Sequence, residues 1–193
     1  MKMLHFGAIS RFMNYAIVEG AMCERHLPFI FSSAAEHASL YRETDNEKLV
    51  RLGPHLVRFG EGEQFASRFL PTAWGQHWGI FICSEANTEQ LLRHFRHFLI
   101  VSTEANRKLY FRFYDPRVLR RFLPTCTARQ LETLFGPVDF FVTESREYKI
   151  ATIFGMERGG LTVKEIDLAS EMKSSDLPQI AARSQERDIQ TIV

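Results

Sequence analysis

Cysteine is scarce in this chain of 193 residues, and its spacing is not that of a cross-linked or metal-bound protein. The three cysteines, Cys23, Cys83 and Cys126, are odd in number and lie far apart. A disulfide framework needs paired cysteines, and a structural zinc site needs ligands only a few residues apart. We therefore expect no disulfide and no metal, in a protein of a reducing compartment such as the cytoplasm.

An excess of charge of one sign is missing as well. Lysine and arginine together number 24 and aspartate and glutamate 23, which leaves a net charge of +1. This balance argues against a protein that binds nucleic acid through basic charge. No run approaches the roughly 18 consecutive apolar residues of a membrane-spanning helix, so we expect no membrane insertion.

The common catalytic and nucleotide-binding motifs are also absent from the sequence. It contains no GxxxxGK[ST] loop, no GxGxxG, no HExxH and no GxSxG. His94 and His97 lie three residues apart on an expected helix, but arginines surround them, which favours a solvated helix face over a metal site. We therefore expect a protein that is not an enzyme and that carries no cofactor.

Phenylalanine is abundant, with 17 residues, and apolar segments of strand and helix type alternate along the chain. This order predicts an α+β (mixed α/β) fold with a central mixed sheet flanked by helices. His77–Cys83 reads as a central strand, with Trp78 on the same face as Ile80 and Ile82. The pattern of Lys108–Tyr114 is the clearest strand signal in the chain.

Helix boundaries are marked by local signals. Asn87 with Gln90, and Thr127 with Gln130, have the spacing of capping boxes, and Pro71 is expected to end a helix over residues 63–70. We divide the chain into an adaptor core domain of residues 1–136 and a C-terminal lobe and tail of residues 137–193. The tail beyond Ser170 is polar, so the fold is expected to end in a strand and tail appendage.

The charged run around residue 115 is expected to form a structural motif, made by Arg112, Asp115, Pro116 and Arg117. Asp115 can cap a helix that begins at Pro116, and Arg112 sits among phenylalanines where an unpaired guanidinium would be costly. An ion pair between Arg112 and Asp115 at the strand-to-helix corner is the favoured interpretation. The alternative is that Arg112 contacts an anion or a partner.

Four short runs of this sequence are similar to those of one known family. The most specific is Phe111-Arg-Phe-Tyr-Asp-Pro-Arg-Val118. His77-Trp-Gly-Ile-Phe81 precedes it, and Leu123-Pro124 and Leu134-Phe-Gly-Pro137 follow it. The family they resemble is the domain-of-unknown-function 4123 family. The resemblance covers roughly residues 14–143. Family domains usually have an aspartate after the first strand, where this chain has Glu19. The family is similar in role to adaptor chaperones of bacterial type VI secretion. The resemblance implies no catalytic residue.

What the resemblance implies is an adaptor that binds a secreted toxin effector and promotes its loading onto the VgrG spike protein. We expect partner contacts mainly in the C-terminal lobe, whose strands are rich in apolar side chains, together with an aromatic pair upstream. The candidate partner-binding residues are Phe141, Ile153, Phe154, Trp74 and Trp78, although core packing is the more ordinary role for the two tryptophans. The competing hypothesis is a small cytoplasmic enzyme with a site around His77, Arg112 and Asp115.

Overall fold

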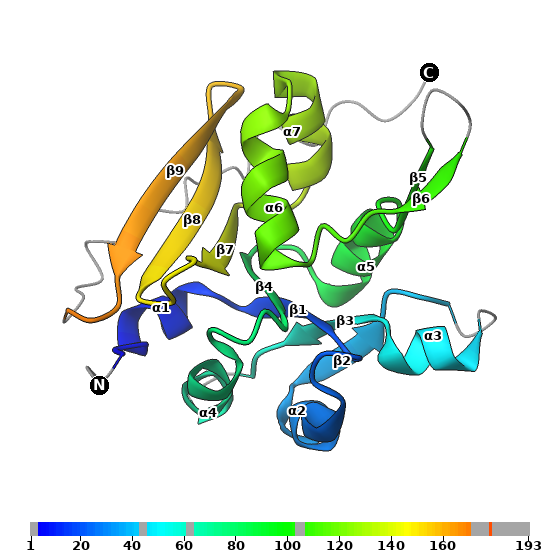
Figure 1. The fold of residues 1–193 in the computed structure, drawn as a ribbon, viewed down its shortest axis with the longest axis vertical. Coiled ribbons are helices and arrows are strands. Elements are labelled where there is room, and N and C mark those ends of the chain that lie inside the picture. Colours follow the sequence, from blue (N-terminus) through cyan, green and yellow to red (C-terminus); the bar gives the residue numbers. More distant parts are fainter. Residues whose placement is uncertain (1–3, 43–45, 61–63, 103–106, 171–177, 179–193) are drawn as a thin grey trace.

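A computed structural model describes residues 4–42, 46–60, 64–102, 107–170 and 178. Its main feature is a seven-stranded sheet in the order β2-β3-β1-β4-β7-β8-β9 (Figure 1). The strands are β1 Tyr15–Glu19, β2 Glu36–Ser39, β3 Pro54–Arg58, β4 Gly79–Cys83, β7 Phe140–Glu144, β8 Ile150–Glu157 and β9 Gly160–Asp167. The α+β class is confirmed, but every pairing in this sheet is antiparallel, so the sheet is not mixed.

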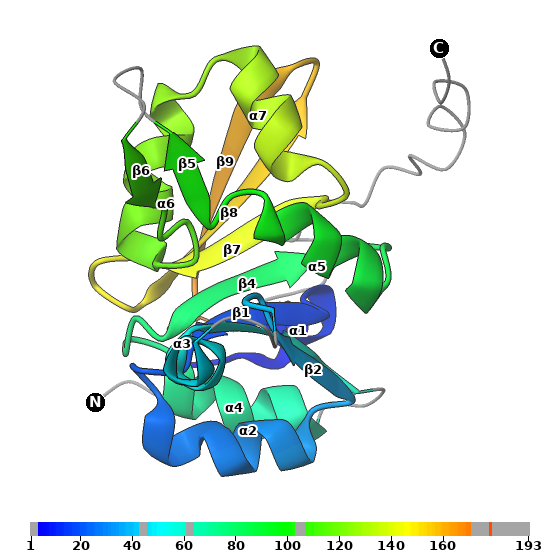
Figure 2. The same cartoon turned by 90° about the vertical axis from the view of Figure 1, so that its right-hand side faces the viewer.

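Helices cover both faces of the sheet (Figure 2). The helices are α1 Gly7–Phe12, α2 Leu27–Ser33, α3 Glu47–Leu52, α4 Gln64–Ala73, α5 Thr88–Arg96, α6 Pro116–Phe122 and α7 Ala128–Phe135, with short 3-10 helices at Glu24–His26 and Leu123–Thr125. One core joins the sheet to α1, α2 and α4, and the other joins it to α5, α6 and α7. The molecule therefore has three layers, with the sheet in the middle.

The predicted central strand is confirmed, because β4 is the fourth of the seven strands and is covered on both faces. Ile80 and Ile82 belong to the core under α5, whereas Phe81 belongs to the opposite core. The expected orientation of Trp78 is wrong, since it belongs to the same core as Phe81 and not to the core of Ile80 and Ile82. The reason is that His77 has a positive φ of 56°, so the alternation of a strand begins only at Gly79.

The predicted strand Lys108–Tyr114 is also wrong over most of its length. Only Lys108–Tyr110 forms a strand, β6, which pairs with β5 (Ile100–Ser102) in a separate two-stranded sheet. After Tyr110 the chain turns, and the Asp115 amide donates to the carbonyl of Arg112. The rings expected to line a strand pack instead on the layer of helices, where Phe113 is completely buried.

The helix boundaries follow their local signals in all but one case. Both capping boxes, Asn87 with Gln90 and Thr127 with Gln130, are present. Pro71 does not end α4, which continues to Ala73. Proline removes only one hydrogen bond from a helix. Here the Trp74 amide still donates to the carbonyl of Leu70, so the last turn of α4 forms despite Pro71.

The C-terminal strands complete the main sheet instead of forming an appendage. β7 pairs with β4, and β8 and β9 form a hairpin that turns at Gly159, where φ is +77°. The main sheet therefore contains strands from both sides of the boundary we predicted between residues 136 and 137. Apart from Pro178, the predicted tail beyond Ser170 lies outside the described residues. In the described part of the chain, no helix has the length and apolar character to cross a membrane.

Candidate functional site

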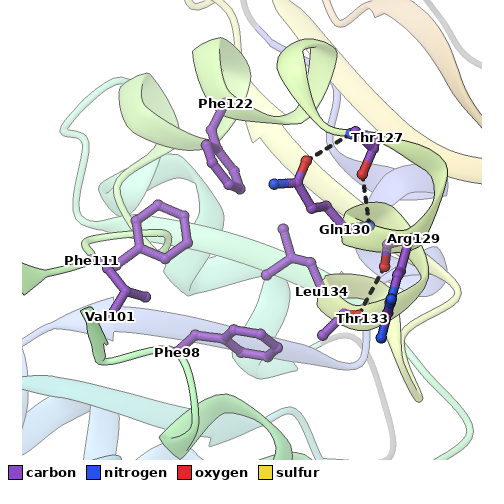
Figure 3. Close-up of a pocket in the computed structure, with 9 residues that line it drawn as sticks. All are labelled: Phe98, Val101, Phe111, Phe122, Thr127, Arg129, Gln130, Thr133 and Leu134. Atoms are coloured by element: carbon purple, nitrogen blue, oxygen red, sulfur yellow. Dashed lines mark hydrogen bonds between the residues drawn. The ribbon is translucent and has the colours of Figure 1, made fainter. Parts of the chain in front are cut away.

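A pocket of about 460 Å³ opens between α5, α6, α7 and the β5–β6 hairpin (Figure 3). We call it the apolar groove. Its apolar lining consists of Phe98, Val101, Phe111, Phe122 and Leu134. Polar side chains of α7 and its capping residue, Thr127, Arg129, Gln130 and Thr133, form one rim. The groove therefore combines an apolar floor with a hydrogen-bonding border.

The three aromatic rings of the groove come from connections or from the end of a helix, Phe122 being the last residue of α6. Phe98 follows α5, and Phe111 follows β6, where its amide donates to the carbonyl of Leu99. The Phe111 ring meets Phe122 edge to face at 4.7 Å between centroids, and Phe98 meets the buried Phe113 at 6.1 Å. These ring contacts fix the shape of the floor, while the capping box of α7 holds the rim beside it.

The β5–β6 hairpin adds exposed apolar surface next to the groove. Ile100, Leu109 and Tyr110 are 48%, 50% and 66% exposed. These are three of the seven large apolar side chains that are exposed among the described residues. Ile100 lies opposite Tyr110 and Val101 opposite Leu109, so apolar side chains occupy both faces of the hairpin. A concentration of this kind is typical of a surface that another molecule covers.

The five predicted partner-binding residues do not lie at the surface. Phe141, Ile153 and Phe154 are 0%, 1% and 2% exposed, and Trp74 and Trp78 are 6% and 7% exposed. The Trp74 ring stacks on Phe81, and its Nε1 donates to the carbonyl of Tyr148 over 2.8 Å. A surface position is wrong for the three residues of β7 and β8, because both faces of these strands are covered by helices or by the N-terminal segment, whereas the two tryptophans have the core packing named above as their more ordinary role.

The charged corner contains the predicted ion pair between Arg112 and Asp115, but Arg117 is the closer partner of Asp115. The Asp115 carboxylate accepts from the Arg117 amide, Nε and Nη2 over 2.9, 2.9 and 2.7 Å, and it caps α6 at Pro116 as expected. Arg112 lies 3.8 Å from Asp115 and pairs more closely with Glu19. Burial would raise the pKa of Asp115, but the hydrogen bonds from Arg117 lower it. Arg117 is therefore its main partner.

A second cavity, of about 650 Å³, lies beside this corner, and we call it the arginine cavity. Its lining consists of His77, Asp115, Arg117, Val118, Arg120, Arg121, Arg146 and Tyr148. Two of the three residues of the enzyme hypothesis, His77 and Asp115, thus meet at one cavity. Arg112 is not part of its lining, because its guanidinium is turned toward Glu19.

His77 is fixed by Glu144, a residue that sequence reasoning missed. The Glu144 carboxylate is 2% exposed and lies 2.5 Å from the His77 Nδ1. It also accepts from the backbone amides of Gly75 and His77, over 2.5 and 3.0 Å. Burial raises the pKa of Glu144, although its interactions with Gly75 and His77 act to lower it. The arrangement holds the turn before β4, where both Gly75 and His77 have positive φ.

The remaining candidate groups are held in structural roles. His94 is not on a solvated face as predicted: its Nε2 donates to the carbonyl of Leu134 over 2.8 Å, and burial lowers its pKa. Burial raises the pKa of Cys23 and Cys83 to about 12, and it also raises that of Cys126. Thiols of this kind stay protonated near neutral pH and are poor nucleophiles. The described residues contain no group of three potential metal ligands.

Comparison with known proteins gives one match. No curated protein and no solved structure is similar to this chain at a significant level. A family model described as a domain of unknown function matches residues 14–133. This range runs from the residue before β1 into α7 and includes every residue of the apolar groove except Leu134. The chain therefore belongs to the DUF4123 family of domains of unknown function.

Proposed function

We propose that this protein is a non-enzymatic adaptor that binds a type VI secretion toxin effector and promotes its loading onto the VgrG spike. The observation that carries the proposal is the apolar groove with its neighbouring hairpin. An adaptor that shields an apolar segment of a client needs an apolar surface bordered by polar groups. The groove offers aromatic rings for the client's apolar side chains, and its rim offers threonine, glutamine and arginine side chains.

The chemistry of the groove favours binding over catalysis. Its lining contains no acid, histidine or cysteine. General acid–base or nucleophilic catalysis would require such a group within reach of a substrate. Apolar burial, at about 25 cal/mol per Å², would supply the affinity for a client segment. The type VI role itself comes from the family resemblance and is the part that needs the direct test.

The enzyme hypothesis rests on the arginine cavity, where His77 and Asp115 lie together. Both are committed to internal partners: His77 to Glu144, and Asp115 to Arg117 and the start of α6. The cavity supplies mainly cationic groups, so we interpret it as a place for binding.

A matched pair of valine variants tests the adaptor proposal. Val101→Asp places a charge in the apolar groove, whereas Val163→Asp places it on β9, where Val163 is 53% exposed. Each tagged protein is purified from the native host, and bound proteins are identified by mass spectrometry. Wild type and Val163→Asp should retain an effector toxin and the spike. The amount of effector that Val101→Asp retains should be at least about tenfold lower than for wild type.

Thermal melting provides the folding control for both variants. An unchanged melting temperature for Val101→Asp, combined with full retention of the effector, would contradict the groove as the client site. Recovery of neither an effector nor a spike with the wild-type protein would contradict the adaptor function itself.

A further inference from the structure

The arginine cavity concentrates cationic side chains in a protein whose net charge is close to zero. Four arginines, Arg117, Arg120, Arg121 and Arg146, line it, and Asp115 is the single acid among the lining residues. Three of the arginines project from α6, at spacings of three and four residues that share one helix face, and the fourth comes from the β7–β8 connection. Two elements far apart in the sequence thus supply one positive surface.

Two acids near this surface, Asp115 and Glu144, are already occupied. Asp115 is 5% exposed and receives three hydrogen bonds from Arg117. The buried Glu144 carboxylate is turned to the backbone amides of Gly75 and His77. Neither carboxylate is therefore available to the other arginines.

The other arginines have little or no internal compensation. Arg120 donates to the main-chain carbonyl of Glu144, which is a neutral acceptor, and burial lowers its pKa. Arg121 and Arg146 are exposed and make no ion pair with any residue in the described part of the chain. Guanidinium groups suit carboxylates because their planar fork can donate two parallel hydrogen bonds.

We propose that the arginine cavity is a second docking site, which binds the carboxylate side chains of an acidic segment of a protein partner. Several arginines spread over a helix and a loop match carboxylates repeated along a peptide better than a single small anion. The Tyr148 hydroxyl and Val118 supply neutral contacts for the peptide between its charges. The identity of the partner, effector or spike, rests on the proposed function. The recognition of an acidic peptide does not depend on it.

A labelled octapeptide in which glutamate alternates with glycine is the direct probe, and the same peptide with glutamine is its control. Fluorescence anisotropy should show binding of the glutamate peptide to the wild-type protein, and the affinity should fall as salt rises from about 50 to 300 mM. The glutamine peptide should bind at least about tenfold more weakly.

The double variant Arg121→Glu/Arg146→Glu should weaken binding of the glutamate peptide about tenfold or more. Lys48→Glu/Arg158→Glu makes the same change of net charge on α3 and at the β8–β9 turn, and it should change the affinity less than about twofold. Both arginines of the first variant are exposed, so melting should be unaffected.

Several results would overturn the proposal: no binding of the glutamate peptide at low salt, equal binding of the glutamine peptide, or equal losses in both double variants. Tight binding of inorganic pyrophosphate without binding of the peptide would identify a phosphate site instead. Val101→Asp should bind the glutamate peptide normally. If the wild-type protein recovers neither an effector nor a spike while it still binds the glutamate peptide, the adaptor function is wrong and the acidic-peptide site remains.

Discussion

Three kinds of contact meet at the carboxylate of Asp115. It caps the first turn of α6, forms a two-pronged ion pair with Arg117, and lies 3.8 Å from Arg112. The side chain is 5% exposed, whereas that of Arg112 is 44% exposed. Solvent screens an exposed guanidinium, so its ion pair with Glu19 contributes less than its short contact suggests.

Asp115→Ala should therefore destabilise the protein more than Arg112→Ala does. We expect a loss of about 1–3 kcal/mol for Asp115→Ala, because the helix cap and the partner of Arg117 both disappear. For Arg112→Ala we expect about 1 kcal/mol or less. Urea unfolding of the two variants measures the difference, and a larger loss for Arg112→Ala would show that the Glu19 pair is the main support of the corner.

At the level of elements, β1 and β4 approach each other closely at Gly79. Gly79 begins β4 opposite Val18, and a side-chain carbon at Gly79 would lie 1.8 Å from the carbonyl oxygen of Ile17. Both strands are central and covered by helices on each face, so neither can move away without disturbing a core. The glycine is required here by the spacing of the strands.

Gly79→Ala should lower the free energy of unfolding by at least about 3 kcal/mol, or roughly 6–12 °C in Tm, since the added methyl group forces the central strands apart. Gly7→Ala is the matched control, because a side-chain carbon at Gly7 meets nothing within 4 Å. Thermal melting followed by circular dichroism compares the two. Equal melting of both variants would mean that the sheet adjusts freely at this position.

For the whole molecule, the buried His55 and the half-buried His94 couple stability to pH. His94 holds the end of α7 through the carbonyl of Leu134, and His55 lies beside the carbonyl of Arg51. Burial lowers the pKa of both rings. In the unfolded chain each ring takes up a proton near pH 6.5. The unfolded state therefore binds more protons below that pH, and stability falls as the pH decreases.

The melting temperature should drop as the pH is lowered from about 7.5 to 5.5, and His94→Gln should drop less over the same interval. The glutamine amide can still donate a hydrogen bond but does not titrate. The raised pKa of Glu144 acts in the opposite direction, because protonation relieves a buried charge. The comparison with wild type cancels that contribution, and identical pH profiles for the two proteins would exclude His94 as a cause.

Local signals in the sequence determined where several elements begin and end. The two capping boxes, the start of α6 at Asp115-Pro116 and the hairpin at Gly159 depend on residues within a few positions of each other. Such interactions form in almost any surrounding structure, so they could be predicted. The α+β class followed in the same way from the alternation of apolar segments.

The tertiary structure alone decided the outcome wherever a pattern was compatible with two environments. Alternating rings after Lys108 fit a strand, but packing against α5 and α6 ends β6 at Tyr110. The apolar strands of the C-terminal lobe fit a partner surface as well as a core, and the helices bury them.

The candidate sites lay beyond sequence reasoning because their residues come together only across the layers. Arg112 pairs with Glu19 over a separation of 93 residues, and the His77 amide reaches Glu144 over 67. The apolar groove likewise forms where α5, α6, α7 and the hairpin meet. The sequence by itself determined the local geometry of the chain, since a few neighbouring residues set the turns and caps. Which side chains meet at a surface depended on how the helices pack on the sheet, because that packing brings distant segments together.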